Sequence, residues 1–164
     1  MLCSGAIAAL IAMPSSVQAD AISYLSFSVG YFNVLDEDKA VDLRAEYRSA
    51  KSVVFENMHP YAGLEVTFDG STWAGGGLLY DHSFAPGWYV TPSLGVGLYS
   101  QGGSDRDLGS ALQFRSQLEI SYEFENSHRA SLAFSHISNA SLGDKNPGSE
   151  VVALYWHMPF DDVF

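Results

Sequence analysis

The sequence predicts an all-β fold, an eight-stranded antiparallel transmembrane β-barrel of the outer-membrane type. Apolar and polar residues alternate with a period of two in segment after segment, and turn-forming residues separate these segments at hairpin spacing. The chain is 47% apolar and only 16% charged, yet no apolar run reaches the roughly 18 residues of a membrane helix. Apolar surface dispersed along strands is how a barrel crosses a membrane.

The first four expected strands occupy residues 25–31, 41–48, 64–69 and 73–80. In the first, Leu25, Phe27, Val29 and Tyr31 alternate with serine and glycine, and the next two alternate in the same way. The Asp69-Gly70 pair is typical of a tight hairpin turn and leads into the glycine-rich fourth strand.

The last four expected strands occupy residues 88–99, 112–124, 132–138 and 150–160. The strand 112–124 has the clearest pattern, since one face is apolar apart from Ser116 and the other is polar throughout. We find no helical period, no domain linker and no repeat beyond the hairpin rhythm.

The direction of the apolar face separates two classes of barrel. An inward apolar face would make a soluble, lipocalin-like carrier, and an outward one makes a membrane barrel. We expect the outward arrangement because the polar face mixes both charges with small residues, which suits the narrow, side-chain-filled lumen of an eight-stranded barrel. The aromatic last residue, Phe164, is also typical of outer-membrane assembly. The polar residues expected in the lumen are Arg44, Glu46, Arg48, Glu65, Gln113, Arg115, Gln117, Glu119 and Glu123.

Residues 1–19 resemble a secretory signal peptide, which leaves residues 20–164 as the barrel. A short apolar run ends near Met13, and Val17-Gln18-Ala19 fits a small-x-small cleavage site. The single cysteine, Cys3, lies in this segment, so an exported chain would have no disulfide framework. The net charge of -11 argues against a nucleic-acid partner, which requires a basic surface.

Three polar residues interrupt the apolar face of the last predicted hairpin. His136 and Ser138 share the face of Leu132 and Phe134, and Glu150 shares the face of Val152 and Leu154. Polar groups exposed to hydrocarbon are costly unless they bond to one another or have a task.

These three residues can form a Ser–His–Glu arrangement. His136 and Ser138 are two residues apart on one strand, roughly 6.5 Å at the backbone, and the loop can bring Glu150 beside the imidazole. Serine would act as nucleophile, histidine as base and glutamate as the group that orients the imidazole. The alternative is a structural one, in which Ser138 begins a turn, His136 is an interfacial aromatic and Glu150 is a solvated strand-end charge.

The segment from His136 to Ala140, followed by Asn146-Pro147-Gly148 and Glu150, resembles the signature of the lipid A 3-O-deacylases, the PagL family. The resemblance implies an eight-stranded outer-membrane barrel that removes the 3-O-linked hydroxyacyl chain from lipid A. It implies Ser138 as nucleophile, His136 as base and Glu150 as its partner. It also implies Asn139, and with it the backbone at Ala140 and Ser141, as oxyanion or positioning groups.

A barrel with both termini in the periplasm would place the loop 139–148, and thus the three residues, at the outer-leaflet level of a Gram-negative outer membrane. The expected partners are lipid A or lipopolysaccharide and the surrounding lipids, without a cofactor or metal. The sequence leaves the oligomeric state open, and a homodimer is one arrangement it allows. Two other functions stay open, a non-catalytic structural or adhesion barrel and an outer-membrane phospholipase.

Overall fold

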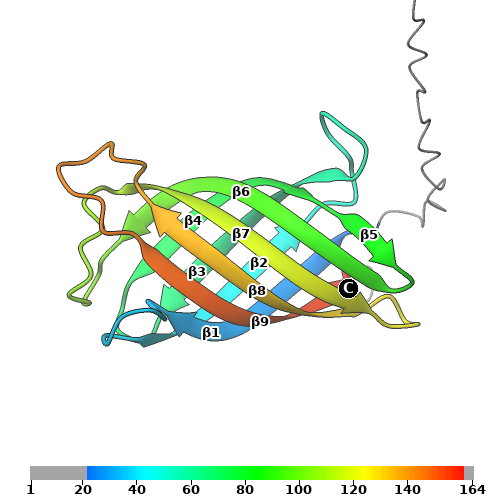
Figure 1. Ribbon diagram of the computed structural model, residues 1–164, viewed down its shortest axis with the longest axis horizontal. Coiled ribbons are helices and arrows are strands. Elements are labelled where there is room, and N and C mark those ends of the chain that lie inside the picture. The colour runs from blue at the N-terminus through cyan, green and yellow to red at the C-terminus, as the bar shows by residue number, and fades with distance from the viewer. Residues whose placement is uncertain (1–21, 161–164) are drawn as a thin grey trace, which may run out of the picture.

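The computed structural model describes residues 22–160, and within this range the chain forms one closed antiparallel sheet (Figure 1). Successive strands pair with one another, except that β4 pairs with β6 and not with β5, and the pairing of β1 with β9 completes the ring. Eight strands therefore form the barrel, as predicted. The strands are β1 (Tyr24–Phe32), β2 (Ala40–Arg48), β3 (Met58–Thr67), β4 (Thr72–Tyr80), β5 (His82–Ala85), β6 (Trp88–Ser100), β7 (Leu112–Glu123), β8 (Arg129–Ser138) and β9 (Ser149–Pro159).

The short strand β5 is an element that the sequence pattern did not predict. It pairs only with the start of β6, and the resulting β5–β6 hairpin continues past the end of β4. Strand β3 also begins at Met58, six residues before the expected start. Its first half contains Pro60 and Gly63, which obscure a period-two pattern. The predicted signal peptide and the role of Phe164 lie outside the described residues.

The apolar face points outward and the polar face points inward. Leu94, Leu118 and Leu154 are 56–68% exposed, whereas the charged residues of the alternate positions are buried. The soluble carrier with an apolar interior is therefore excluded. Among residues 22–160 no helix is long and apolar enough to span a membrane.

An ion-pair network fills the middle of the lumen. Arg48 bridges Glu46 at 3.0 Å and Glu119 at 2.9 Å, and Arg115 also pairs with Glu46. Arg44 pairs with Asp42 at 2.9 Å and with Glu65 at 3.0 Å. Apart from Asp42, all of these residues were expected in the lumen. Gln113 and Gln117 of the expected set are buried as well, whereas Glu123 is only half-buried and pairs with Arg129 at 2.8 Å. Because buried charges are stable only when paired, the network locks the strands together and fills the interior.

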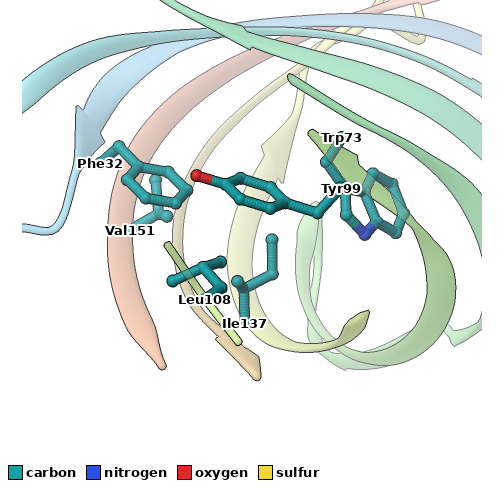
Figure 2. Packing of buried hydrophobic residues seen from close by; sticks show 6 residues of the cluster. All are labelled: Phe32, Trp73, Tyr99, Leu108, Ile137 and Val151. Atoms are coloured by element: carbon teal, nitrogen blue, oxygen red, sulfur yellow. The ribbon is translucent and has the colours of Figure 1, made fainter. Parts of the chain in front are cut away.

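One end of the barrel carries the loops 33–39, 68–71, 101–111 and 139–148, and we call it the site end. Its interior is apolar, which the sequence did not predict. Six buried side chains meet there, and Figure 2 shows them packed inside the strands: Phe32, Trp73, Tyr99, Leu108, Ile137 and Val151. This plug closes the lumen beneath the loops. At the opposite end an aromatic cluster faces outward, as expected of an interfacial girdle: Trp88, Tyr122, Phe124 and Trp156.

Candidate functional site

The hairpin of β8 and β9 places His136 directly opposite Glu150. His136 Nδ1 lies 3.1 Å from Glu150 Oε1. A carboxylate can only accept, so this bond requires the proton on Nδ1 and leaves Nε2 as the basic nitrogen. The two side chains are 43% and 26% exposed, on the outward face of the barrel.

The loop before β9 packs against the same imidazole ring. Gly148 has a φ of +68°, and a Cβ added there would lie 2.7 Å from His136 Cε1. A side chain at this position would force the imidazole ring or the loop to shift. Glycine therefore lets the loop backbone hold one edge of the ring while the carboxylate holds another.

Ser138 lies two residues beyond His136 on the same face and is half-buried. Within the described part of the chain its Oγ has no hydrogen-bond partner, so the structure does not join it to His136 as it joins Glu150. Catalytic hydrogen bonds are often long before substrate binds, and within the described residues no hydrogen bond occupies His136 Nε2. Between the two residues, Ile137 points inward into the apolar plug (Figure 2), which fixes the outward direction of its neighbours.

The residues after Ser138 form a tight turn with unusual backbone. Ala140 and Ser141 have φ values of 51° and 63°, and Leu142 N donates to Asn139 O at 3.0 Å. Two successive left-handed residues with this bond make a turn that glycine or asparagine normally occupies. The N–H groups of Ala140 and Ser141 have no acceptor within residues 22–160, so both donors are unused.

Asn139, for which the family resemblance implies an oxyanion or positioning role, uses its side chain within the protein. Its side chain is fully buried, and Nδ2 donates to Leu108 O at 2.8 Å and to Lys145 O at 2.7 Å. Both amide hydrogens are therefore used within the protein. Of the two roles expected for Asn139, these contacts favour positioning over direct donation to an oxyanion.

An apolar groove of about 500 Å³ opens on the outward surface of β4 and β6. Its wall includes Phe114, the direct cross-strand partner of Ser138. Ser116, the one polar residue on this face of β7, lies between His136 and Leu94 of the groove wall. Gly76 and Gly77 of β4 line the groove. Ser116 stands out in the sequence, but its position beside His136 depends on strand register.

The model of the lipid A 3-O-deacylase (PagL) family matches residues 41–159. The chain belongs to the PagL family. Lipid A deacylase PagL of Bordetella bronchiseptica is 31% identical over 74 residues, which cover 44% of this chain and 42% of that protein. The matched segment thus spans less than half of the relative's length.

Solved structures agree on the fold. The crystal structure of the outer membrane enzyme PagL matches with a TM-score of 0.63 at 21% identity, over 84% of this chain and 99% of that one. Neisserial surface protein A (NspA) matches with a TM-score of 0.61 at 12% identity, over 84% and 97%. A designed transmembrane β-barrel matches with a TM-score of 0.59 at 10% identity, over 86% and 98%. Membership of the PagL family and the closed barrel assign the chain to the outer membrane of a Gram-negative cell.

Other titratable clusters do not resemble a metal centre. Among residues 22–160 no group of three or more His, Cys, Asp or Glu side chains could hold a metal ion. His157 is buried in the lumen between Ser26 and Ser131.

Proposed function

We propose that this PagL-family chain is a serine esterase that removes the 3-O-linked hydroxyacyl chain from lipid A. Ser138 would act as nucleophile, His136 as general base and Glu150 as the group that orients the imidazole. The observation that carries the proposal is the 3.1 Å contact between His136 Nδ1 and Glu150 Oε1 on the outward face. Polar side chains on a surface that otherwise faces lipid are energetically costly, so a pair of them there indicates a functional role.

The reaction would follow the general scheme of serine esterases. Ser138 Oγ attacks the ester carbonyl carbon as its proton moves to His136 Nε2. The resulting oxyanion accepts hydrogen bonds from the N–H groups of Ala140 and Ser141. Collapse of this intermediate breaks the bond to the sugar oxygen, which takes the proton from Nε2. Water activated by His136 then hydrolyses the acyl-serine, which releases a 3-hydroxy fatty acid.

The position of the three residues suits a lipid ester. The site opens toward the membrane, so an acyl chain could reach Ser138 without leaving the apolar phase. The groove beside Phe114 offers apolar surface for that chain, and each methylene kept out of water contributes about 0.8 kcal/mol.

The topology supports an outer-leaflet location for the site. Tyr24 of β1 pairs with Pro159 of β9 at the end opposite the site. With that end in the periplasm, the loop 139–148 would lie at the cell surface, in the leaflet that contains lipopolysaccharide.

Mass spectrometry of lipid A from cells that express the chain tests the proposal. Wild type should remove one hydroxyacyl group from the 3 position, and Ser138→Ala should leave lipid A intact. Ser83→Ala, an exposed serine of β5 at the opposite end, is the matched control and should behave as wild type.

Two results would contradict the proposal. Identical lipid A from wild type and Ser138→Ala would favour a non-catalytic barrel. Hydrolysis of phospholipid but not lipid A by the purified protein would favour a phospholipase. The oligomeric state, including a homodimer, can be measured on the same sample by sedimentation.

A further inference from the structure

The loop 139–148, which follows Ser138, is fastened to the loop 101–111 between β6 and β7. Asn139 Nδ2 donates to Leu108 O across 31 residues of sequence. Lys145 Nζ lies 2.8 Å from Asp107 Oδ2, and Gly109 N donates to Asp107 Oδ1 at 2.8 Å. We call this set the loop clamp, and it consists of Asp107, Leu108, Gly109, Asn139, Gly143 and Lys145.

The two loop backbones touch so closely that only glycine fits between them. A Cβ on Gly109 would lie 2.1 Å from Lys145 O, and its φ of +79° also disfavours other residues. A Cβ on Gly143 would lie 2.3 Å from Gly109 O. Real Cβ contacts are never this short, so a side chain at either glycine must separate the loops.

The clamp holds a turn that would not keep its shape by itself. Ala140 and Ser141 are both in the left-handed region, which is unfavourable for residues with a Cβ and persists only where surrounding contacts impose it. Asn139 provides such contacts, because its N–H donates to Asn146 Oδ1 at 2.9 Å and its amide to the two carbonyls. The Leu108 side chain adds an anchor in the apolar plug, beside Ile137 (Figure 2).

We propose that the loop clamp positions the 139–142 turn over Ser138, so that the loop 101–111 controls the activity of a site to which it contributes no catalytic group. The proposal rests on the proposed function for its kinetic consequence. In it Asn139 and Gly109 are positioning residues that act through the N–H groups of Ala140 and Ser141. Substrate binding by the outward apolar surface does not involve the clamp, so kcat should respond and KM should not.

Two variants and one control test the clamp in the folded barrel. Gly109→Ala separates the loops, and Asn139→Asp keeps the shape of the side chain but removes both amide donors. Asp105→Asn changes an exposed acid on the same loop that has no contact with residues 139–148. Retained heat-modifiable migration on gels confirms that each barrel is folded.

Two readouts are needed, kcat and KM for lipid A hydrolysis and hydrogen exchange of residues 139–148. Gly109→Ala and Asn139→Asp should lower kcat by about tenfold to a hundredfold, the scale expected for misplacement near 1 Å. KM should change less than about twofold, and exchange should rise by about tenfold. Asp105→Asn should match wild type in both.

Unchanged exchange in both variants would overturn the clamp itself. Faster exchange with unchanged kcat would overturn its positioning role. A wild-type protein no more active than Ser138→Ala would instead contradict the proposed function, and exchange alone would then decide whether the clamp holds the turn.

Discussion

Two histidine–glutamate pairs within residues 22–160 lie in the barrel wall, and they differ in what surrounds them. His157 lies 3.0 Å from Glu119 in the lumen, and its ring nitrogens also contact Ser26 and Ser131 at 2.8 Å. His136 lies 3.1 Å from Glu150 on the outward face. The side chains of the inner pair, His157 and Glu119, are each 2% exposed. In the outer pair the His136 side chain is 43% exposed and that of Glu150 is 26% exposed.

The comparison separates residue type from function. Both sites contain serine, histidine and glutamate, yet in the inner one every ring nitrogen is already bonded and no substrate can enter. In the outer one a single hydrogen bond, from Nδ1 to Glu150, orients the ring, and Nε2 has no hydrogen-bond partner within the described residues. A constellation of catalytic residue types therefore has meaning only with its access and its unused donors and acceptors.

The largest expected difference concerns the two serines. Ser138→Ala should lower hydrolysis by about 10⁴-fold, because in the proposed mechanism it removes the nucleophile. Ser131→Ala removes a contact to His157 and should lower the free energy of unfolding by about 1 kcal/mol, with kcat unchanged. Lipid A hydrolysis and urea unfolding in vesicles measure both effects. Labelling of Ser131 by a serine-directed phosphonate would contradict the comparison.

The second largest effect should come from the lumen network. Arg48→Met leaves Glu119 and Glu46 without the guanidinium that bridges them, which should lower the free energy of unfolding by about 3–5 kcal/mol. The surviving folded protein should keep the kcat of wild type. Lys51→Met, an exposed loop residue, is the control and should leave the urea midpoint unchanged.

Glu150→Gln should lower kcat by about 10²-fold with little change in unfolding. The amide can no longer stabilise a protonated imidazole, and it removes the preference for the proton on Nδ1. The rate with lipid A and the urea midpoint are the measurements. A loss of stability without a loss of rate would make the outer pair structural, like the inner one.

The smallest expected effect concerns the exposed ion pair of the loop clamp. The hydrogen bond from Lys145, together with that from Gly109 N, holds the pKa of Asp107 below its usual value. A lowered pKa in the folded state means that the stabilising contribution is full above pH about 4 and is lost as pH falls further. Hydrogen exchange of residues 139–148, corrected for intrinsic rates, should thus stay constant from pH 7 to 5. Lys145→Met should change kcat less than about twofold, since the pair is screened by water.

The period-two pattern was sufficient to predict the barrel and to identify the polar residues on the apolar face of the last hairpin. Leu132 and Phe134 define an outward face, so His136 and Ser138 stand out on it from the alternation alone. The same pattern did not predict β5, the early start of β3 or the inward Phe32 and Ile137. Strand β5 is too short to show a pattern, and glycine and proline interrupt the pattern at the start of β3. Phe32 and Ile137 point inward at the end of the barrel where loops cover the lumen, and alternation alone does not reveal that end.

Alternation along the chain was enough to show which side chains share a face, because it is a local property of the extended backbone. The position of Glu150 opposite His136 required the folded barrel, because a ten-residue loop allows many registers. The folded barrel also brought Leu108 to Asn139 and joined β4 to β6, since contacts across 31 residues or around a closed ring depend on every strand. The candidate residues are therefore visible in the chain, whereas their access, their partners and the support of the turn beside them are properties of the closed fold.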